Sequence, residues 1–258
     1  MSALKKLKVF AGIILFAMIS CTDDTEKSGT FKLAFQHYVD GNPLIRDSMM
    51  YVNAAENPYE ITEIMYFISR VKLYNHNGKV VELNTASPFH YINPDYPQTL
   101  TWESVGEIPE GTYDSISFIF GLRADDNISN RFVNAPESNM AWPEVLGGGY
   151  HYMMMNGFYE DAEGNKKTNN FHLGTGQVIN GGDTTFIDNS FTVTPKGLPF
   201  SISWGAVTTG VLTMNIESWF DTPVVYDFNF WGGAIMQKQA AMEAACKNGK
   251  DAFTIEFN

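Results

Sequence analysis

Short apolar and aromatic segments separated by turn residues recur along most of this chain, and they constrain its fold more than any other feature. Apolar and polar side chains alternate over residues 31–39, as in a half-buried strand. Asn75–Gly78 and Pro109–Thr112 are turn signals. We expect strands at residues 31–39, 61–74, 79–83, 113–122, 150–158, 170–173, 186–193, 210–219 and 251–257. This pattern predicts a mainly β protein, a single antiparallel β-sandwich.

One segment near the end of the chain has a different composition. Residues 234–247 are rich in Ala, Met, Gln, Lys and Glu, which favour helix, and Asn248-Gly249 is a stop signal. We expect one C-terminal helix here. Its Ile235, Met242 and Cys246 side should face the sandwich, with Gln237, Lys238 and Glu243 largely outward.

The first twenty residues resemble an export signal. Three lysines precede an apolar run at residues 9–19, which is too short to span a bilayer as a helix. Small Ser20 then precedes Cys21, and residues 18–21 resemble a lipobox, after which the cysteine is acylated. The alternative is an ordinary signal peptide followed by an incidental cysteine. We therefore expect a lipoprotein signal peptide at residues 1–20, an acidic tether at residues 21–29 and one domain at residues 30–258.

These features predict an outer-membrane lipoprotein anchored through Cys21. Acidic residues after the cysteine resemble the surface-export signal of Bacteroidota lipoproteins, and a periplasm-facing anchor is the alternative. The chain has 17 basic and 29 acidic residues, with a formal net charge of −12. Such a surface repels phosphate backbones, so we do not expect a nucleic-acid partner. The two cysteines, Cys21 and Cys246, cannot form a disulfide framework.

No local motif supports catalysis. The chain contains neither H-E-x-x-H nor G-x-S-x-G, and the glycine run at residues 147–149 lacks the Lys-Ser/Thr of a phosphate-binding loop. We therefore expect a protein that is not an enzyme. Three histidines lie on predicted strands: His37, His151 and His172. Strand alternation predicts that His151, Met153 and Met155 share one face, and imidazole with thioether suits copper, especially Cu(I).

Several elements, in this order, resemble the MbnP-like copper-binding domain, named after a protein associated with methanobactin operons. They are Phe35-Gln36-His37 with Gly41–Leu44, Tyr66–Ser69, Pro109–Tyr113 with Gly121-Leu122, Met140–Pro143 with Gly148–Tyr150, and Phe171–Gly174. The resemblance covers about residues 30 to 258. It implies an exported, mostly β domain.

In the better-known relatives, copper is held by histidine and by a tryptophan oxidised to kynurenine. The resemblance makes His37 and His172 the best ligand candidates and Trp142 the candidate for oxidation. Many members have a second tryptophan soon after the first, whereas Glu144–Leu146 follow here. His151 would be the natural substitute ligand. We expect His37 and His172 to meet across adjacent strands, with His151 close by and with Tyr150 or Ser69 orienting a ring.

Two functions from different classes remain. The first is a cell-envelope lipoprotein that binds copper through histidines, for metal acquisition or buffering. The alternative is a non-catalytic surface module whose exposed aromatic rings stack on a glycan or a protein partner. The partners we expect are a metal ion and the membrane that holds the lipid anchor.

Overall fold

The computed structural model describes residues 26–258, which form two β-sheets, a separate hairpin and a few short helices. The signal peptide, Cys21 and most of the tether lie outside the described residues, so those predictions are untested. The first strand begins at Ser28, so the last two residues assigned to the tether already belong to the sheet. The mainly β class and the C-terminal helix are confirmed.

The smaller sheet is built around the first strand of the fold. Its strands run in the order β17-β16-β1-β2, and two short strands also pair with β1. The six strands are β1 (Ser28–Val39), β2 (Asn42–Pro43), β7 (Thr101–Glu103), β8 (Ile108–Pro109), β16 (Val207–Asn215) and β17 (Phe253–Phe257). The pair β1–β16 is parallel, so the prediction of an antiparallel sandwich does not hold for this pair of strands.

The larger sheet has nine strands, ordered β11-β10-β4-β9-β14 along its main path. The long central strand β4 also pairs with three short strands, and β15 pairs with β9. The members are β3 (Tyr51–Val52), β4 (Pro58–Asn75), β5 (Val80–Glu82), β6 (Phe89–Ile92), β9 (Gly111–Phe120), β10 (Met153–Glu160), β11 (Lys166–Leu173), β14 (Phe191–Val193) and β15 (Phe200–Ile202).

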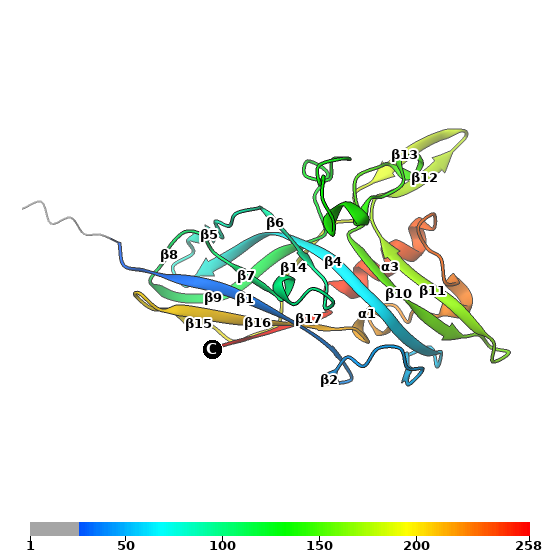
Figure 1. Cartoon of the computed structure of the whole chain (residues 1–258), viewed down its shortest axis with the longest axis horizontal. Coiled ribbons are helices and arrows are strands. Elements are labelled where there is room, and N and C mark those ends of the chain that lie inside the picture. The colour runs from blue at the N-terminus through cyan, green and yellow to red at the C-terminus, as the bar shows by residue number, and fades with distance from the viewer. Residues whose placement is uncertain (1–25) are drawn as a thin grey trace, which may run out of the picture.

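The strands of the smaller sheet lie against those of the larger sheet (Figure 1). Aromatic side chains fill the space between the two sheets. Tyr66 and Phe118 from the larger sheet contact Phe253 from the smaller one, with ring centres 6.5 and 5.2 Å apart. All three side chains are fully or almost fully buried. Large rings bury much apolar area, so these contacts hold the two layers together.

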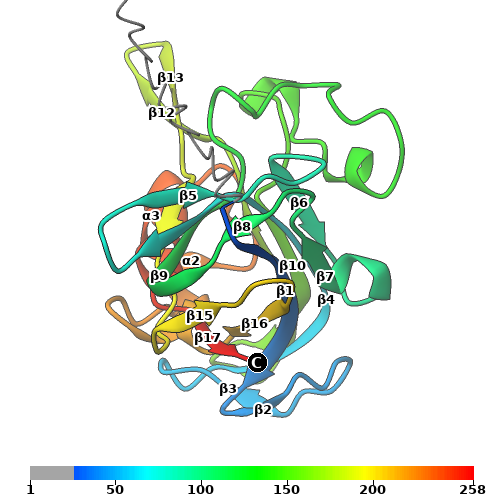
Figure 2. The ribbon, with the colours of Figure 1, turned by 90° about the vertical axis from the view of Figure 1, so that its left-hand side faces the viewer.

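Two features project from the same end of the sandwich (Figure 2). One is the hairpin β12 (Gly176–Asn180) and β13 (Asp183–Ile187), which pairs only with itself. The other is the connection between β9 and β10.

The helices are short. The 3₁₀ helices are η1 (Pro97–Leu100), η2 (Glu137–Met140) and η3 (Glu144–Leu146), and the α-helices are α1 (Ser218–Asp221), α2 (Phe228–Trp231) and α3 (Gln239–Gly249).

Two predicted strands extend too far. The segment predicted at residues 186–193 divides into β13 and β14, because the Asp188 side chain accepts a hydrogen bond from the Ser190 N–H and turns the chain between them. The strand predicted at residues 210–219 ends with β16, and Trp219 lies on α1. A period-2 pattern alone does not reveal such a turn.

The C-terminal helix starts later than predicted. Ala234 forms a parallel bridge to Asn170 on the edge strand β11, so the chain there is extended. The helix α3 begins only at Gln239, after a turn in which the Lys238 N–H donates to the Ile235 carbonyl. The predicted inward face is confirmed for Ile235 and Met242, which are buried. None of the helices in residues 26–258 is long and apolar enough to cross a membrane.

We predict that Cys246 reacts slowly with thiol reagents in the folded protein. Its Sγ donates to the Asn189 carbonyl, and burial raises the pKa of the thiol to about 12. Since the thiolate is the reactive form, labelling at pH 7.5 should be at least about 100-fold slower than after unfolding. Labelling is followed by mass spectrometry in a Cys21→Ser variant.

The matched control carries Glu243→Cys with Cys21→Ser and Cys246→Ala. This cysteine sits on the exposed face of the same helix. It should react at nearly the same rate before and after unfolding. Equal native rates at positions 243 and 246 would contradict the buried packing of Cys246.

Candidate metal centre

His37 lies inside the sandwich, away from the other strand histidines. It is on β1 of the smaller sheet, and its ring contacts the edge of Tyr66 at 5.7 Å between ring centres. Tyr66 belongs to β4 and faces the smaller sheet through Phe253. The His37 side chain therefore lies between the two sheets.

His172 lies on the opposite face of the larger sheet. In the β4–β10–β11 register, Tyr66 aligns with Met153 and Leu173, whereas Met65 aligns with Met154 and His172. Aligned residues share a face and successive residues alternate, so His172 points away from the face that carries Tyr66 and contacts His37. The prediction that His37 and His172 meet across adjacent strands is therefore wrong.

The structure does bring His151 and His172 together. Their ring centres are 5.0 Å apart and the rings are nearly perpendicular, at 85°. His151 precedes β10, and the chain bends at Tyr152 before the strand begins. This bend breaks the alternation, so the prediction that His151 shares a face with Met153 and Met155 is wrong.

Hydrogen bonds fix the proton on each ring and leave one nitrogen free. His151 Nδ1 lies 2.9 Å from the Met140 carbonyl, which only accepts, so Nδ1 carries the proton. Asn156 donates its amide N–H to Glu63 at 2.9 Å, so its amide oxygen faces His172 Nε2 at 2.7 Å. The proton of His172 is therefore on Nε2. Met140 and Asn156 orient the rings, rather than the predicted Tyr150 or Ser69.

The remaining nitrogens, His151 Nε2 and His172 Nδ1, are buried and have no hydrogen-bond partner. Leaving a buried acceptor unpaired costs about 1–3 kcal/mol, so such an atom is conspicuous in a native site. Both hold a lone pair, which is what a metal ion requires of imidazole. Within residues 26–258, however, no group of three or more His, Cys, Asp or Glu side chains is arranged to hold a metal.

Burial keeps both rings neutral. It lowers the pKa of His172 to about 4, with a smaller contribution from neighbouring His151. Burial also lowers the pKa of His151, partly opposed by its hydrogen bonds to the backbone around Met140. Neutral imidazole is the form that binds metals, so no proton has to leave at pH 7 before an ion enters.

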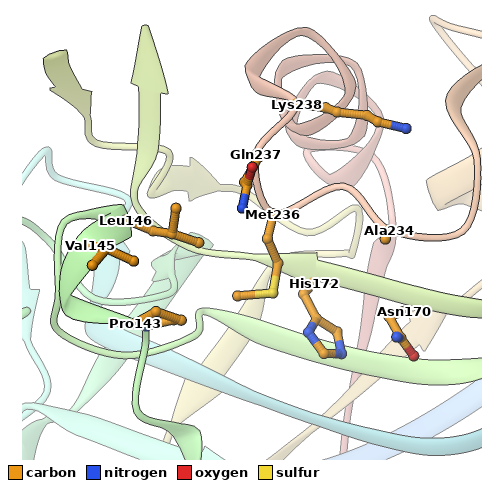
Figure 3. Close-up of a pocket in the computed structure, with 9 residues that line it drawn as sticks. All are labelled: Pro143, Val145, Leu146, Asn170, His172, Ala234, Met236, Gln237 and Lys238. Atoms are coloured by element: carbon orange, nitrogen blue, oxygen red, sulfur yellow. The ribbon is translucent and has the colours of Figure 1, made fainter. Parts of the chain in front are cut away.

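A pocket of about 530 Å³ opens beside His172 (Figure 3). Pro143 and Leu146 form one wall, and Met236 with its neighbours forms the opposite wall. His172 stands on β11, beside Met236 in Figure 3. The lining is mostly apolar, so it would shield an ion held at His172 from bulk water.

Trp142 packs directly behind the histidine pair. Its indole lies 4.7 Å from the His151 ring centre, and its Nε1–H donates to the Leu146 carbonyl at 3.1 Å. A Cβ at Gly174 would lie 2.6 Å from the indole, so the glycine that follows Phe171-His172-Leu173 leaves room for this ring. The Met140–Pro143 and Phe171–Gly174 blocks of the sequence therefore meet in space.

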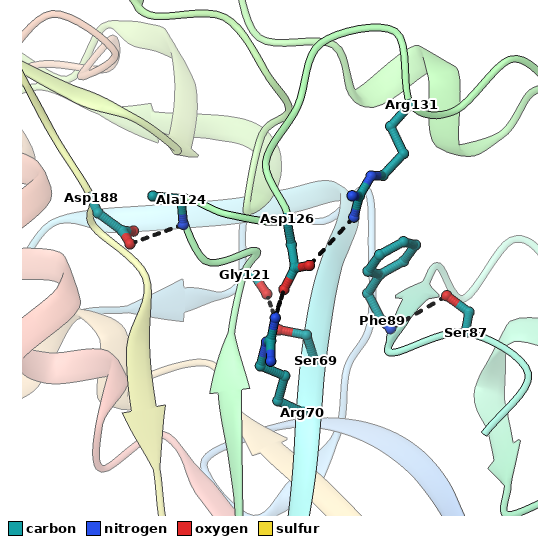
Figure 4. A network of polar contacts seen from close by, with 9 residues as sticks. All are labelled: Ser69, Arg70, Ser87, Phe89, Gly121, Ala124, Asp126, Arg131 and Asp188. Carbon is teal, nitrogen blue, oxygen red and sulfur yellow. Dashed lines mark hydrogen bonds and ion pairs between the residues drawn. The ribbon is translucent and has the colours of Figure 1, made fainter. Parts of the chain in front are cut away.

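The loop after β9 positions His151, and Figure 4 shows the ion pairs that hold this loop. Asp126 accepts a hydrogen bond from Arg70 on β4 at 2.8 Å and pairs with Arg131 at 3.5 Å. Next to it, Asn127 accepts the backbone N–H of the residue before His151 at 2.8 Å. The ion pairs thus tie the loop to the central strand, and the loop holds the bend that carries His151.

The other two histidines are accounted for by packing or solvent. His90 is stacked between Phe35 and Trp102 and contacts the Thr99 carbonyl through Nε2. His76 is exposed in the β4–β5 turn beside Asp114. Sequence reasoning missed Asn156, Glu63 and Met236. No spacing signal marks them, because they reach His172 only through strand register and a distant loop.

We predict that His37 makes stability depend on pH. Burial, then Arg46, lowers its pKa to about 4, against about 6.5 when unfolded. Between these values the unfolded chain binds more protons, so stability falls as pH drops from about 6.5 to 4. His37→Leu should remove its share of that loss, up to about 3 kcal/mol. Urea unfolding at pH 7, 5.5 and 4.5 measures this, and an unchanged pH slope would contradict it.

A family model and a solved structure both relate this chain to MbnP. The MbnP family model matches residues 28–237. Among solved structures, MbnP from Methylosinus trichosporium superposes with a TM-score of 0.57 at 14% identity, covering 90% of this chain and 99% of that one. At that identity the match shows a shared fold. No curated protein matched in sequence. Because the family model spans most of the chain, this protein belongs to the MbnP family.

Proposed function

We propose that this protein binds copper at the cell envelope through His151 and His172, for metal acquisition or buffering. The observation that carries the proposal is the pair of neutral imidazoles, 5.0 Å apart, each with a buried nitrogen that has no protein partner. The copper association of the MbnP family supports the choice of metal. Imidazole is a good copper ligand.

The environment of the pair favours capture of a cation. The hydrogen bonds that the rings donate to the Met140 carbonyl and the Asn156 amide oxygen orient both rings before the ion arrives, so little ordering is needed on binding. The chain carries a formal net charge of −12, which attracts cations without selecting among them. The chemistry is therefore binding and release of an ion.

Trp142 remains the candidate for oxidation, beside His151. An unmodified indole offers a metal no donor atom, and its N–H is already bonded to the Leu146 carbonyl. The proposal therefore depends on the imidazoles. Intact-mass analysis of the protein purified from its native source would reveal a modified Trp142.

The alternative function, a surface module for a glycan or a protein, has less support. Of the five tryptophans, Trp204 is 70% exposed, whereas the other four are buried or partly buried. We therefore favour the copper site.

We predict that His172→Ala and His151→Ala each weaken Cu(I) binding at least tenfold, about 1.4 kcal/mol, because each removes one donor atom. Affinity is measured anaerobically at pH 7 by competition with a chromogenic chelator, using residues 21–258 with Cys21→Ser. Circular dichroism verifies that each variant is folded.

The matched control is His37→Ala. His37 resembles His172 in burial, in its pKa of about 4 and in having an unpartnered nitrogen, but its contacting ring is Tyr66 rather than imidazole. Its replacement should leave copper affinity within about twofold. Equal losses for His37→Ala and His172→Ala would contradict the proposed pair.

We also propose that Cys21 carries a lipid anchor, because an apolar run and a small residue precede it. Cys21→Ser should move the protein from the membrane fraction to the soluble fraction when the full chain is expressed in a bacterial host. Unchanged membrane partitioning would refute the lipobox. Protease treatment of intact cells distinguishes a surface anchor from a periplasm-facing one.

A further inference from the structure

The wall of the pocket that faces His172 carries a thioether. Met236 and His172 line the same cavity, and Figure 3 shows the Met236 side chain extending from its loop towards the His172 ring. Met236 is partly buried and packs against the apolar core. It belongs to the segment between α2 and α3, more than sixty residues from His172 in sequence.

The backbone of this segment is fixed against the edge of the larger sheet. The Gly233 carbonyl accepts the Asn170 N–H at 2.6 Å, and Ala234 bridges to Asn170. A Cβ at Gly233 would lie 1.8 Å from the Thr168 carbonyl, so only glycine permits this approach. On the other side of Met236, the chain is held by buried Ile235 and the turn at Lys238. Met236 therefore lies two residues after Ala234, the residue that bridges to β11.

The spacing of the two histidine rings leaves a coordination position open. Two imidazoles binding one ion linearly would hold their ring centres about 6 Å apart, from two metal–nitrogen distances of about 2 Å and roughly 1 Å from each nitrogen to its ring centre. The observed 5.0 Å is shorter. At this spacing the two rings could not hold an ion in a linear arrangement, so one side of the ion would be open to a third donor.

A thioether is the donor that a soft ion prefers. Methionine sulfur suits Cu(I), whereas Cu(II) prefers nitrogen and oxygen ligands in a tetragonal arrangement. Methionine has three rotatable side-chain bonds, so its sulfur can adjust to an ion while its backbone stays in place. The pocket lining is largely apolar, its charged residue is Lys238, and it adds no carboxylate that would favour the harder ion.

We propose that Met236 Sδ is the third ligand of the site, and that the resulting two-histidine, one-methionine donor set selects Cu(I) over Cu(II). This inference rests on the proposed function, since it takes His151 and His172 as the other two ligands. It assigns a specificity role to a residue outside the histidine pair.

Met154 offers a matched control. It is also partly buried, and it lies directly opposite His172 on the neighbouring strand β10, on the same face. Unlike Met236, it does not line the pocket. Leucine replaces methionine at either position with little change in volume, so the fold should tolerate both substitutions.

The test measures Cu(I) and Cu(II) affinities of the wild type, Met236→Leu and Met154→Leu by chelator competition. Met236→Leu should weaken Cu(I) binding by at least about tenfold and change Cu(II) binding by less than about threefold. Met154→Leu should match the wild type for both ions. X-ray absorption of the Cu(I) form should show one sulfur neighbour, lost in Met236→Leu.

Each outcome decides between the two proposals. If Met236→Leu keeps wild-type Cu(I) affinity while His172→Ala loses it, the methionine ligand is overturned and the histidine site stands. If Met154→Leu alone weakens Cu(I) binding, the third ligand is Met154 and the assignment to Met236 is overturned. If the wild type binds neither ion, the proposed function fails, and the ligand assignment fails with it.

Discussion

The continuous register across β4, β10 and β11 is the constraint on which the rest of the molecule depends. One row of aligned residues, Tyr66, Met153 and Leu173, faces the core between the sheets. The adjacent row, Met65, Met154 and His172, faces the other way. A shift of one residue would exchange the two rows and would place His172 in the core. The same hydrogen bonds therefore build the sandwich and present the candidate ligand.

Two nitrogen atoms of the candidate site have no hydrogen-bond partner, and each keeps a lone pair for a metal ion. A chain from Glu63 through Asn156 fixes the proton of His172, and the Met140 carbonyl fixes that of His151. Burial then opposes protonation of the two remaining nitrogens. The protein pays for two unpartnered acceptors in its interior, and a bound cation would satisfy both at once.

Membership of the MbnP family and a shared fold do not by themselves identify the metal ligands of this chain. At 14% identity to the solved relative, the sandwich is shared, but the side chains that hold an ion must be argued from this chain. In the proposed site the second histidine comes from the bend before β10, and the thioether comes from the segment before α3.

Local patterns in the sequence were sufficient for the mainly β class, most long strands and the C-terminal helix, because side-chain periodicity depends only on neighbouring residues. The order of motifs also predicted the family, and it pointed to His172 and Trp142, which lie near one another across His151. The sequence predicted that His37 belongs to the same site. In the structure His37 contacts Tyr66 on one face of the larger sheet, whereas His172 lies on the opposite face. Strand register and a bend at Tyr152 decide which histidines meet and place Asn156 beside His172. A loop bridged to β11 places Met236 in the same pocket as His172. Only tertiary structure decides these contacts, because they join residues that no local period relates.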